Sequence, residues 1–439
     1  MRWPLLAALA LPLLLCAPSL SASNPRASGF AGARAGALAG AATASVEDCS
    51  AAYSNPANLG AQGNSWLCLD YSADFARLEP GGRSRADSSL HTVGGGLVAR
   101  GKLFDLPFGV GAMLALPSAK LSRIEAVAPE DTTWVLDTNR PRVSFGAIGL
   151  GLSPVPALSL GVALHVLAGI RGRFDVSGAL AQSDPYDSQL RHGVDADLAS
   201  ARSFAAAATW RASDALRVAL VYRHRARVVQ EIEGDLAGTL GTPPLVVPAR
   251  YTARTRVTPA AYPSTLALST ELELGRALSL FAELGWEDFS EWKGPDESST
   301  TSLLLAEFPA DLGAEPPRQA KPAAHDRWLP RLGAEYDLRF DARTALSLRG
   351  GYAFERSPLP LQRTTRWLDA DRHTFSAGGG LRIVVGPGTR DRDAELHLDA
   401  YGLVTLMPER DAVAENELGA AEAASGRRFG LGLSSAYTF

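Results

Sequence analysis

The stretch that decides the fold is residues 144–170, SFGAIGLGLSPVPALSLGVALHVLAGI, which contain no Asp, Glu, Lys or Arg. An apolar run of this length suits a membrane-spanning helix. Two prolines, Pro154 and Pro156, stand at its centre, where they would break a helix. Beyond them, from Leu158 to Val166, every second residue is Leu or Val, which is the period of a β-strand. The stretch therefore predicts two strands joined by a turn that contains proline.

The same alternation recurs further along the chain, in residues 278–287, 327–340, 346–355 and 395–404. Strands of this kind also occur in soluble β-sandwiches, which are the competing interpretation. Many of the segments, however, reach the roughly 9–11 residues that a tilted strand needs to cross a membrane, whereas strands of globular proteins are usually shorter. Their length favours a transmembrane β-barrel.

The expected connections alternate between short and long, as they do in outer-membrane barrels. Short turns are expected near residues 105–107, 153–156, 212–214, 275–277, 341–342 and 386–391. Longer polar loops are expected near residues 78–88, 117–140, 175–198, 235–248, 293–326, 355–370 and 408–426. Counting the segments between these connections predicts an all-β fold, a transmembrane antiparallel barrel of about 14 strands.

One face of each predicted strand is apolar and would meet lipid, because a closed barrel pairs every backbone polar group. Aromatic residues toward the strand ends are expected to form interfacial girdles, namely Trp286, Trp292, Trp328, Tyr352 and Phe354. The opposite face would line the lumen with charged residues, namely Arg217, Arg223, Arg225, Arg331, Arg339, Arg349, Glu283 and Glu335.

The first residues indicate export. Arg2 precedes an apolar run, and small residues follow from Ser19, so residues 1–23 are expected to be a signal peptide cleaved near Ser21 or Ser23. Cys16 raises the alternative of a lipoprotein, but a lipobox requires a small residue before the cysteine and Leu15 stands there.

Removal of the signal leaves two cysteines, Cys49 and Cys68. In an oxidising periplasm they would form a disulfide that closes a loop of about 20 residues and stabilises the fold by roughly 3 kcal/mol. The alternative is two buried free thiols. Cysteine and histidine show no zinc spacing, and neither a metal nor a cofactor is expected.

Composition argues against several partners. With 43 basic and 47 acidic residues the net charge is −4, so no overall field favours nucleic acid. The hydrophobic share of 46% is ordinary for a soluble protein and low for a helical membrane protein.

The chain ends in a strand that alternates from Phe429 to Phe439. A terminal aromatic on an alternating last strand, here Tyr437 and Phe439, resembles the signal that the outer-membrane barrel assembly machinery recognises. We therefore expect that machinery and outer-membrane lipid to be partners, in the cell outer membrane of a Gram-negative bacterium.

Residues 24–63 do not alternate and are rich in Gly and Ala. A barrel of about 14 strands has an interior too wide for its own side chains to fill. The expected domains are therefore a signal peptide at 1–23, a small N-terminal hatch, or plug, at 24–63 inside the barrel, and the barrel itself at 64–439.

Several pieces, in their order along the chain, resemble the outer-membrane long-chain fatty acid transporter family, which includes aromatic-hydrocarbon channels (FadL- and TodX-type proteins). The pieces are the Gly/Ala segment running into Glu47-Asp48, the motif Asn55-Pro56-Ala57, residues 286–292 (WEDFSEW), residues 351–354 (GYAF) with Ser357-Pro358, and residues 368–380 (LDADRHTFSAGGG). The resemblance covers nearly the whole mature chain.

The resemblance implies a transport protein for passive uptake of hydrophobic compounds, with long-chain fatty acids or hydrocarbons as its small-molecule partners. It implies that ligand reaches a pocket near the start of the hatch, and that a hatch movement releases it sideways through the barrel wall. Arg173 stands where the family places a basic residue before Phe, so it is a candidate ligand for a carboxylate headgroup, with a rim charge as the alternative. Phe30 is a candidate contact for the acyl chain. A monomer is expected.

Two other classes compete with the transporter. A general or structural porin would have an open lumen without a hatch. An outer-membrane lipid hydrolase would need a Ser, a His and an acid within reach of one another, and no Gly-x-Ser-x-Gly motif occurs in the sequence. The protein is therefore expected not to be an enzyme.

Overall fold

The computed structural model describes residues 32–80, 85–118, 133–134, 144–179, 189–242, 245–290, 296–305, 324–360, 367–387, 393–415 and 421–439. Its helices in these ranges are α1 (Gly32–Ala37), α2 (Ala51–Ser54) and the 3₁₀ helix η2 (Pro56–Gly60). The strands are β1 (Trp66–Pro80), β2 (Arg85–Leu103), β3 (Leu106–Pro117), β4 (Thr133–Trp134), β5 (Ser144–Val155), β6 (Leu158–Ala179), β7 (Gln189–Arg211), β8 (Leu216–Arg223), β9 (Ala226–Thr242), β10 (Leu245–Tyr262), β11 (Ser264–Leu274), β12 (Leu278–Asp288), β13 (Asp296–Leu305), β14 (Arg327–Arg339), β15 (Thr344–Glu355), β16 (Trp367–Leu368), β17 (Arg372–Pro387), β18 (Asp393–Glu415) and β19 (Ala421–Thr438).

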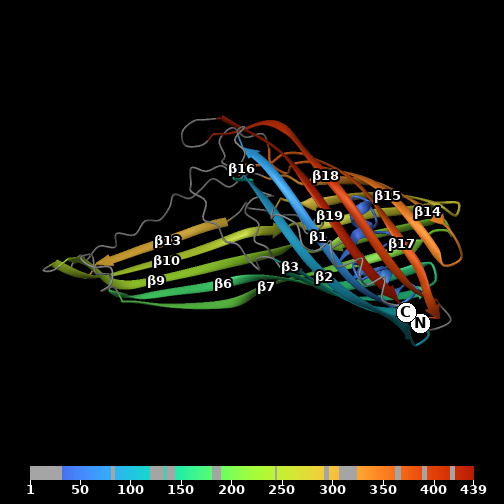
Figure 1. The fold of residues 1–439 in the computed structure, drawn as a ribbon, viewed down its shortest axis with the longest axis horizontal. Helices are drawn as coiled ribbons and strands as arrows, with labels where there is room; N and C mark the ends of the chain where they lie inside the picture. Colours follow the sequence, from blue (N-terminus) through green and yellow to red (C-terminus); the bar gives the residue numbers. More distant parts are fainter. Residues whose placement is uncertain are drawn as a thin grey trace, which may run out of the picture.

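Within the described ranges, 14 of these strands close into one antiparallel ring, which confirms the predicted fold class (Figure 1). The order around the ring is β1-β2-β3-β5-β6-β7-β8-β11-β12-β14-β15-β17-β18-β19. The last strand closes the ring on the first, in a register that begins with Trp66 opposite Thr438 and continues with Leu67 opposite Tyr437. Each strand is therefore paired on both edges, as a strand in lipid requires.

The five predicted short turns that the structure describes fall at one end of the ring, where the C-terminus also lies (Figure 1). The proline-rich stretch forms β5 and β6 as expected, although β5 continues to Val155 and the turn is Pro156-Ala157. The turn expected at residues 386–391 lies mostly outside the described residues. Short turns mark the periplasmic rim of an outer-membrane barrel, so the opposite end is the extracellular one.

Four predicted long loops are largely β-structure, and those four predictions were wrong. β1 and β2 extend into the loop expected at 78–88, and β18 and β19 extend into the loop expected at 408–426. β6 and β7 extend into the expected loop at 175–198, and β9 and β10 form a hairpin across 235–248. Together with β13, strands β6, β7, β9 and β10 build an arm that projects from the extracellular end of the barrel (Figure 1).

The arm escaped prediction although β10 shows a period of two. Apolar residues at every second position alternate with mostly polar ones, namely Leu245, Val247, Ala249, Tyr251 and Ala253 against Val246, Pro248, Arg250, Thr252 and Arg254. Charged residues of opposite sign face each other across the β9–β10 hairpin: Arg250 pairs with Asp235 at 2.5 Å and Arg254 with Glu233 at 3.0 Å. Such cross-strand pairs stabilise a sheet without a buried apolar face.

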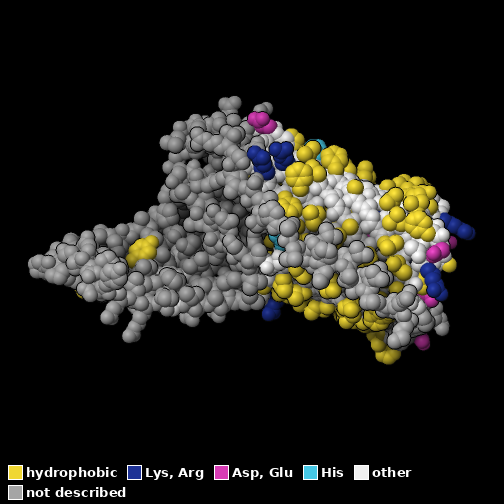
Figure 2. Space-filling view, viewed as in Figure 1, with side chains coloured by type: hydrophobic (Ala, Val, Ile, Leu, Met, Phe, Trp, Pro, Cys, Tyr) yellow, Lys and Arg dark blue, Asp and Glu magenta, His cyan; other side chains and the backbone are white. Residues whose placement is uncertain are grey.

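An apolar belt surrounds the barrel. Outward residues of successive strands are Leu or Val with large exposed fractions, for example Leu69 at 64%, Val162 at 56% and Leu433 at 54% (Figure 2). Exposed apolar surface on this scale indicates contact with lipid rather than with water. No helix in the described residues is long and apolar enough to span a membrane.

Four of the predicted girdle residues, those that the structure describes, lie on the outward face. Trp328 is 59% exposed and lies opposite Trp286 across β12–β14, while Tyr352 and Phe354 are partly exposed on β15. Trp292 lies outside the described residues.

We predict that a charge in the middle of the belt destabilises the barrel more than the same charge at its edge. On β2, Leu97 lies midway between His91 and Leu103, the last residue of the strand, and both leucines are 46% exposed. Leu97→Lys should lower the free energy of unfolding by about 2–4 kcal/mol and Leu103→Lys by at most about 1 kcal/mol, because the cost of a cation depends on its depth in the bilayer. Urea unfolding in lipid vesicles measures both. Equal losses would contradict the assigned belt.

Candidate functional site

Residues 32–65, which we call the luminal segment, lie inside the barrel (Figure 1). α1 contacts β15, β17, β18 and β19 on one side of the wall, and η2 contacts β3, β5, β6 and β7 on the other. Ala37, Leu38 and Leu59 have no exposed surface. The segment therefore spans the lumen from wall to wall.

Glycines of the barrel wall that contact the luminal segment are required for steric reasons. A Cβ on Gly161 of β6 would lie 2.2 Å from the Pro56 carbonyl carbon, and one on Gly351 of β15 would lie 2.4 Å from the Leu38 carbonyl carbon. At these two positions the backbone of the luminal segment touches the backbone of the wall, so no other residue fits without displacing the segment.

Asn55-Pro56-Ala57 holds the segment together and to the wall. The Asn55 side chain is fully buried; its Oδ1 accepts a hydrogen bond from the Ala57 amide, and its Nδ2 donates to the Thr43 carbonyl and to Thr209 Oγ1 of β7, both at 2.9 Å. Pro56 begins η2, where its missing N–H costs nothing. The motif thus has a structural reason that does not depend on any ligand.

Asn58 was not among the residues chosen from the sequence, but like Asn55 it donates hydrogen bonds to backbone carbonyls of the luminal segment. Its Nδ2 donates to the carbonyls of Ala44 and Val46 at 3.0 and 2.9 Å. Both asparagines saturate backbone carbonyls of the turns that precede α2. Its position directly after Asn55-Pro56-Ala57 was the signal that could have identified it.

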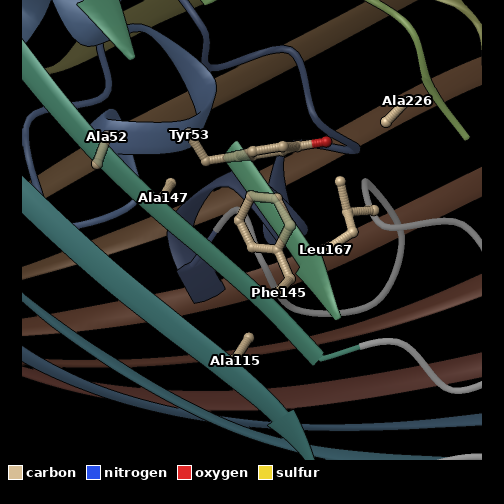
Figure 3. Packing of buried hydrophobic residues seen from close by; sticks show 7 residues of the cluster. All are labelled: Ala52, Tyr53, Ala115, Phe145, Ala147, Leu167 and Ala226. Carbon is tan, nitrogen blue, oxygen red and sulfur yellow. The ribbon is translucent and has the colours of Figure 1, made fainter. Parts of the chain in front are cut away.

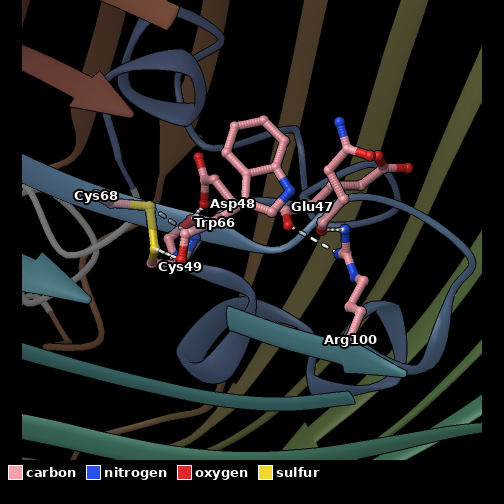
Figure 4. Close-up of a disulfide and its surroundings, with 8 residues drawn as sticks. Glu47, Asp48, Cys49, Trp66, Cys68 and Arg100 are labelled. Carbon is pink, nitrogen blue, oxygen red and sulfur yellow. Dashed lines mark hydrogen bonds between the residues drawn. A yellow bond between two sulfur atoms is a disulfide. The ribbon is translucent and has the colours of Figure 1, made fainter. Parts of the chain in front are cut away.

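Two wall arginines bind carbonyls of the luminal segment. Arg100 of β2 donates to the carbonyls of Glu47, Asn58, Leu59 and Asn64 at 2.9–3.3 Å (Figure 4). Arg223 of β8 donates to the carbonyls of Tyr53 and Ser54, at the end of α2, and its guanidinium lies 5.0 Å from the centre of the Tyr53 ring. Cations are favourable at the carbonyl ends of helices. The alternation placed Arg223 in the lumen correctly but could not reveal what it binds.

Tyr53 also anchors the segment through apolar contacts. Its ring meets Phe145 of β5 edge-on with 4.8 Å between centres, and Leu167 and Ala226 complete the cluster around them (Figure 3). Ala226 belongs to the start of β9, so the base of the extracellular arm packs on the luminal segment.

A disulfide joins Cys49 of the segment to Cys68 of β1, with 6.1 Å between the Cα atoms (Figure 4). Both cysteines are buried.

Charged groups connect the periplasmic side of the segment to the wall. Arg34 pairs with Glu335 at 2.9 Å, and Glu47 pairs with Arg217 at 3.2 Å. Glu271 lies between the two arginines, and Arg349 extends the chain from Glu335 to Asp399. Burial opposes the charge on Arg34, but the charge and hydrogen bonds of Glu335 raise the pKa of Arg34 above its ordinary value. The guanidinium therefore stays protonated.

The segment separates two cavities that share no lining residue. The extracellular one, of about 80 Å³, is lined by Gly36, Gly40 and Tyr53 of the segment and by wall residues that include Arg223, Glu283, Arg331 and Glu355. The periplasmic one, of about 380 Å³, is lined by the ion pairs of Arg34, Glu47 and their partners. The described lining of the extracellular cavity has two cations and two anions and hence no net charge.

The remaining predicted site residues are placed as follows. Phe30 lies outside the described residues. Arg173 lies in the part of β6 that belongs to the arm, opposite Asp195 of β7 and Glu233 of β9. Its register therefore gives it acidic residues on both neighbouring strands.

Tyr437 and Phe439 stack on the outward face with 6.1 Å between ring centres. The backbone of Phe439 exchanges two 3.1 Å hydrogen bonds with Ser65, the last residue of the luminal segment. Among the described residues no group of three or more His, Cys, Asp or Glu could hold a metal.

No protein-family model matches the sequence, and no curated protein matches it. Solved structures do. A Pseudomonas aeruginosa FadL homologue aligns over 96% of this chain and 99% of its own with a TM-score of 0.59 and 16% identity. The monoaromatic hydrocarbon channel CymD aligns over 95% and 99% with a TM-score of 0.54 and 16% identity.

The chain has the fold of the FadL-type channels. A third structure with this fold, the P. putida toluene transporter TodX, covers 93% of the chain and 98% of its own length with a TM-score of 0.52 and 16% identity. The resemblance found in the sequence thus extends to the whole architecture, the FadL-type fold of a closed barrel around an N-terminal segment.

We predict that a side chain at position 161 dislodges the segment. Gly161→Val should place methyl groups on the backbone of Pro56 and raise the ion conductance of the reconstituted barrel, since the lumen would lose its filling. Gly146→Val is the matched control, because a Cβ at Gly146 has 3.8 Å of room. Planar-bilayer recordings measure the conductance of both variants. Equal conductances would refute the close contact between Gly161 and Pro56.

We also predict that an alkylating reagent labels neither Cys49 nor Cys68 in the unfolded, unreduced protein, and labels both after reduction, because the bond in the structure leaves no thiol. Peptide mass spectrometry reads the label, and labelling without reduction would show two free thiols.

Proposed function

We propose that the protein is a non-enzymatic outer-membrane channel for passive uptake of hydrophobic compounds, with long-chain fatty acids as the first candidate. The observation that supports this best is the luminal segment itself: it closes the lumen between an extracellular and a periplasmic cavity. A general porin would need an open passage at this level. In the proposal the luminal segment is the hatch.

The charges of the periplasmic cavity favour lateral release over passage along the axis. Its walls carry Arg34, Glu271 and Glu335 together with further ion pairs. An apolar chain that entered this wet cavity would lose about 0.8 kcal/mol for each CH₂ exposed to water. A sideways exit into the membrane avoids that loss.

The contacts of the segment also indicate how it would move. Its start, around Gly32–Gly40, lines the extracellular cavity, while Cys49 and the residues bound by Arg100 are fixed to the wall. Ligand in the cavity would therefore displace the part before Glu47 and leave Cys49, α2 and η2 in place.

Neutral aromatic hydrocarbons are the second candidate substrate. Arg331 pairs with Glu283 at 2.5 Å and lies 4.0 Å from Glu355, so the described lining offers a carboxylate headgroup no surplus cation. Two of the aligned structures are a toluene transporter and a monoaromatic hydrocarbon channel by name. Arg173 would supply the headgroup cation in the fatty-acid proposal.

Uptake of a labelled long-chain fatty acid and of labelled toluene by outer-membrane vesicles, with and without the protein, separates the two candidates. Fatty-acid uptake that depends on the protein and falls several-fold with Arg173→Ala supports the first. Toluene uptake alone supports the second. Protein-dependent uptake of neither compound would refute the transport proposal.

Movement of the segment is tested by locking it. A Cβ on Gly333 of β14 would lie 3.3 Å from Leu38 Cβ, close to the roughly 3.5–4.5 Å span of a disulfide. We predict that oxidised Leu38→Cys/Gly333→Cys loses uptake and that reduction restores it. The single variants and the wild type under the same redox conditions are the controls. Unchanged uptake by the oxidised pair would show that this part of the segment need not move.

A further inference from the structure

A Tyr–His pair flanked by phenylalanine recurs on the outward face of the barrel. Tyr71 Oη lies 2.7 Å from His91 Nδ1, Tyr222 Oη 3.1 Å from His224 Nδ1, and Tyr352 Oη 2.9 Å from His373 Nδ1. In each cluster a phenylalanine ring packs on the histidine, namely Phe75, Phe204 and Phe354 respectively.

An exposed arginine accompanies each of these phenylalanines, two residues closer to the extracellular end of the strand. Arg77 follows Phe75 on β1, Arg202 precedes Phe204 on β7, and Arg356 follows Phe354 at the end of β15. A fourth arginine repeats the pattern. Arg427 precedes Phe429 on β19, where it lies directly opposite Arg77 while Phe429 lies opposite Phe75.

The clusters are distributed around the whole ring. They occupy the strand pairs β1–β2, β7–β8 and β15–β17, which are five, five and four strands apart in the ring order. Aromatic residues in this position mark the membrane interface, so the arginines lie at the level of the outer-leaflet headgroups. Charged side chains also appear at the margins of the apolar belt in Figure 2.

From this arrangement we infer that the barrel binds phosphorylated glycolipid of the outer leaflet, through phosphate groups held by Arg77 with Arg427, by Arg202 and by Arg356. A guanidinium donates two parallel hydrogen bonds to phosphate oxygens. The Tyr and His below it offer further polar groups, and the phenylalanines contact the acyl chains. Arg77 and Arg427 lie directly opposite each other, so one phosphate can lie within reach of both guanidinium groups.

The periplasmic rim supplies a matched control. Exposed arginines also lie at the turn end of the barrel, namely Arg211, Arg276, Arg339 and Arg343. In a membrane they would face the other leaflet. Replacing four arginines by glutamine at either rim changes the net charge by the same amount, so a difference between the two sets reports position rather than charge.

The test is a titration of the purified protein in a neutral maltoside detergent with lipid A, a glycolipid that carries two phosphates, and with dephosphorylated lipid A. Native mass spectrometry counts the bound lipids. The wild type should bind lipid A at least ten-fold more tightly than the dephosphorylated form, since a basic residue near a membrane surface contributes about five-fold per arginine.

The variant R77Q/R202Q/R356Q/R427Q should lose that preference, and R211Q/R276Q/R339Q/R343Q should keep it. The double variant R77Q/R427Q should lose part of it, which provides a test if the quadruple variant folds poorly. Inorganic phosphate at millimolar concentration should not displace the lipid. Equal binding of both lipids by the wild type, equal losses at both rims, or displacement by free phosphate would overturn the proposal.

Discussion

Closure of the strand ring through β1 and β19 is the constraint on which the rest of the structure depends. A barrel in lipid must pair every edge, and this one does so with 14 strands. A ring of that size leaves a lumen that wall side chains alone do not fill. The luminal segment fills this space. The Ser65–Phe439 hydrogen bonds link the segment to closure of the ring, because the segment ends where the last strand ends.

The luminal segment is held by polar contacts, which are strong because they are buried. Arg331 and Glu283 are 4% and 2% exposed, and Arg100 satisfies four carbonyls of a segment that has little regular structure of its own. A buried polar group without a partner is costly, so each of these contacts discourages any arrangement in which the segment is only partly docked. The balance of charges also explains how a lumen rich in arginine avoids net repulsion.

Prediction from sequence succeeded where a period of two was visible. The stretch 144–170 became β5 and β6, the lumen faces of β12 and β14 carry Glu283 and Arg331 as expected, and strand counting reached the correct ring. It failed in the arm, where the charges of Arg250, Arg254 and their acidic partners gave a loop-like composition although Leu245 to Ala253 alternate with a period of two. Arg225 and Arg339, also expected on the lumen face, are exposed, since each lies beside the end of its strand. For the site, composition indicated a small-residue segment inside the barrel, but the partners of Asn58 and Arg100 depend on contacts between distant parts of the chain.

The luminal segment fills the closed ring and, in the proposed mechanism, moves when a hydrophobic ligand binds. Hydrogen–deuterium exchange of the bilayer-embedded protein measures both properties. We expect slow exchange of the amides from Ala51 to Gly60 with or without ligand, since they are buried and anchored, and faster exchange of Gly32 to Ala44 once a bound ligand displaces α1. Fast exchange throughout the segment without ligand, or exchange unchanged by a ligand that demonstrably binds, would contradict this expectation.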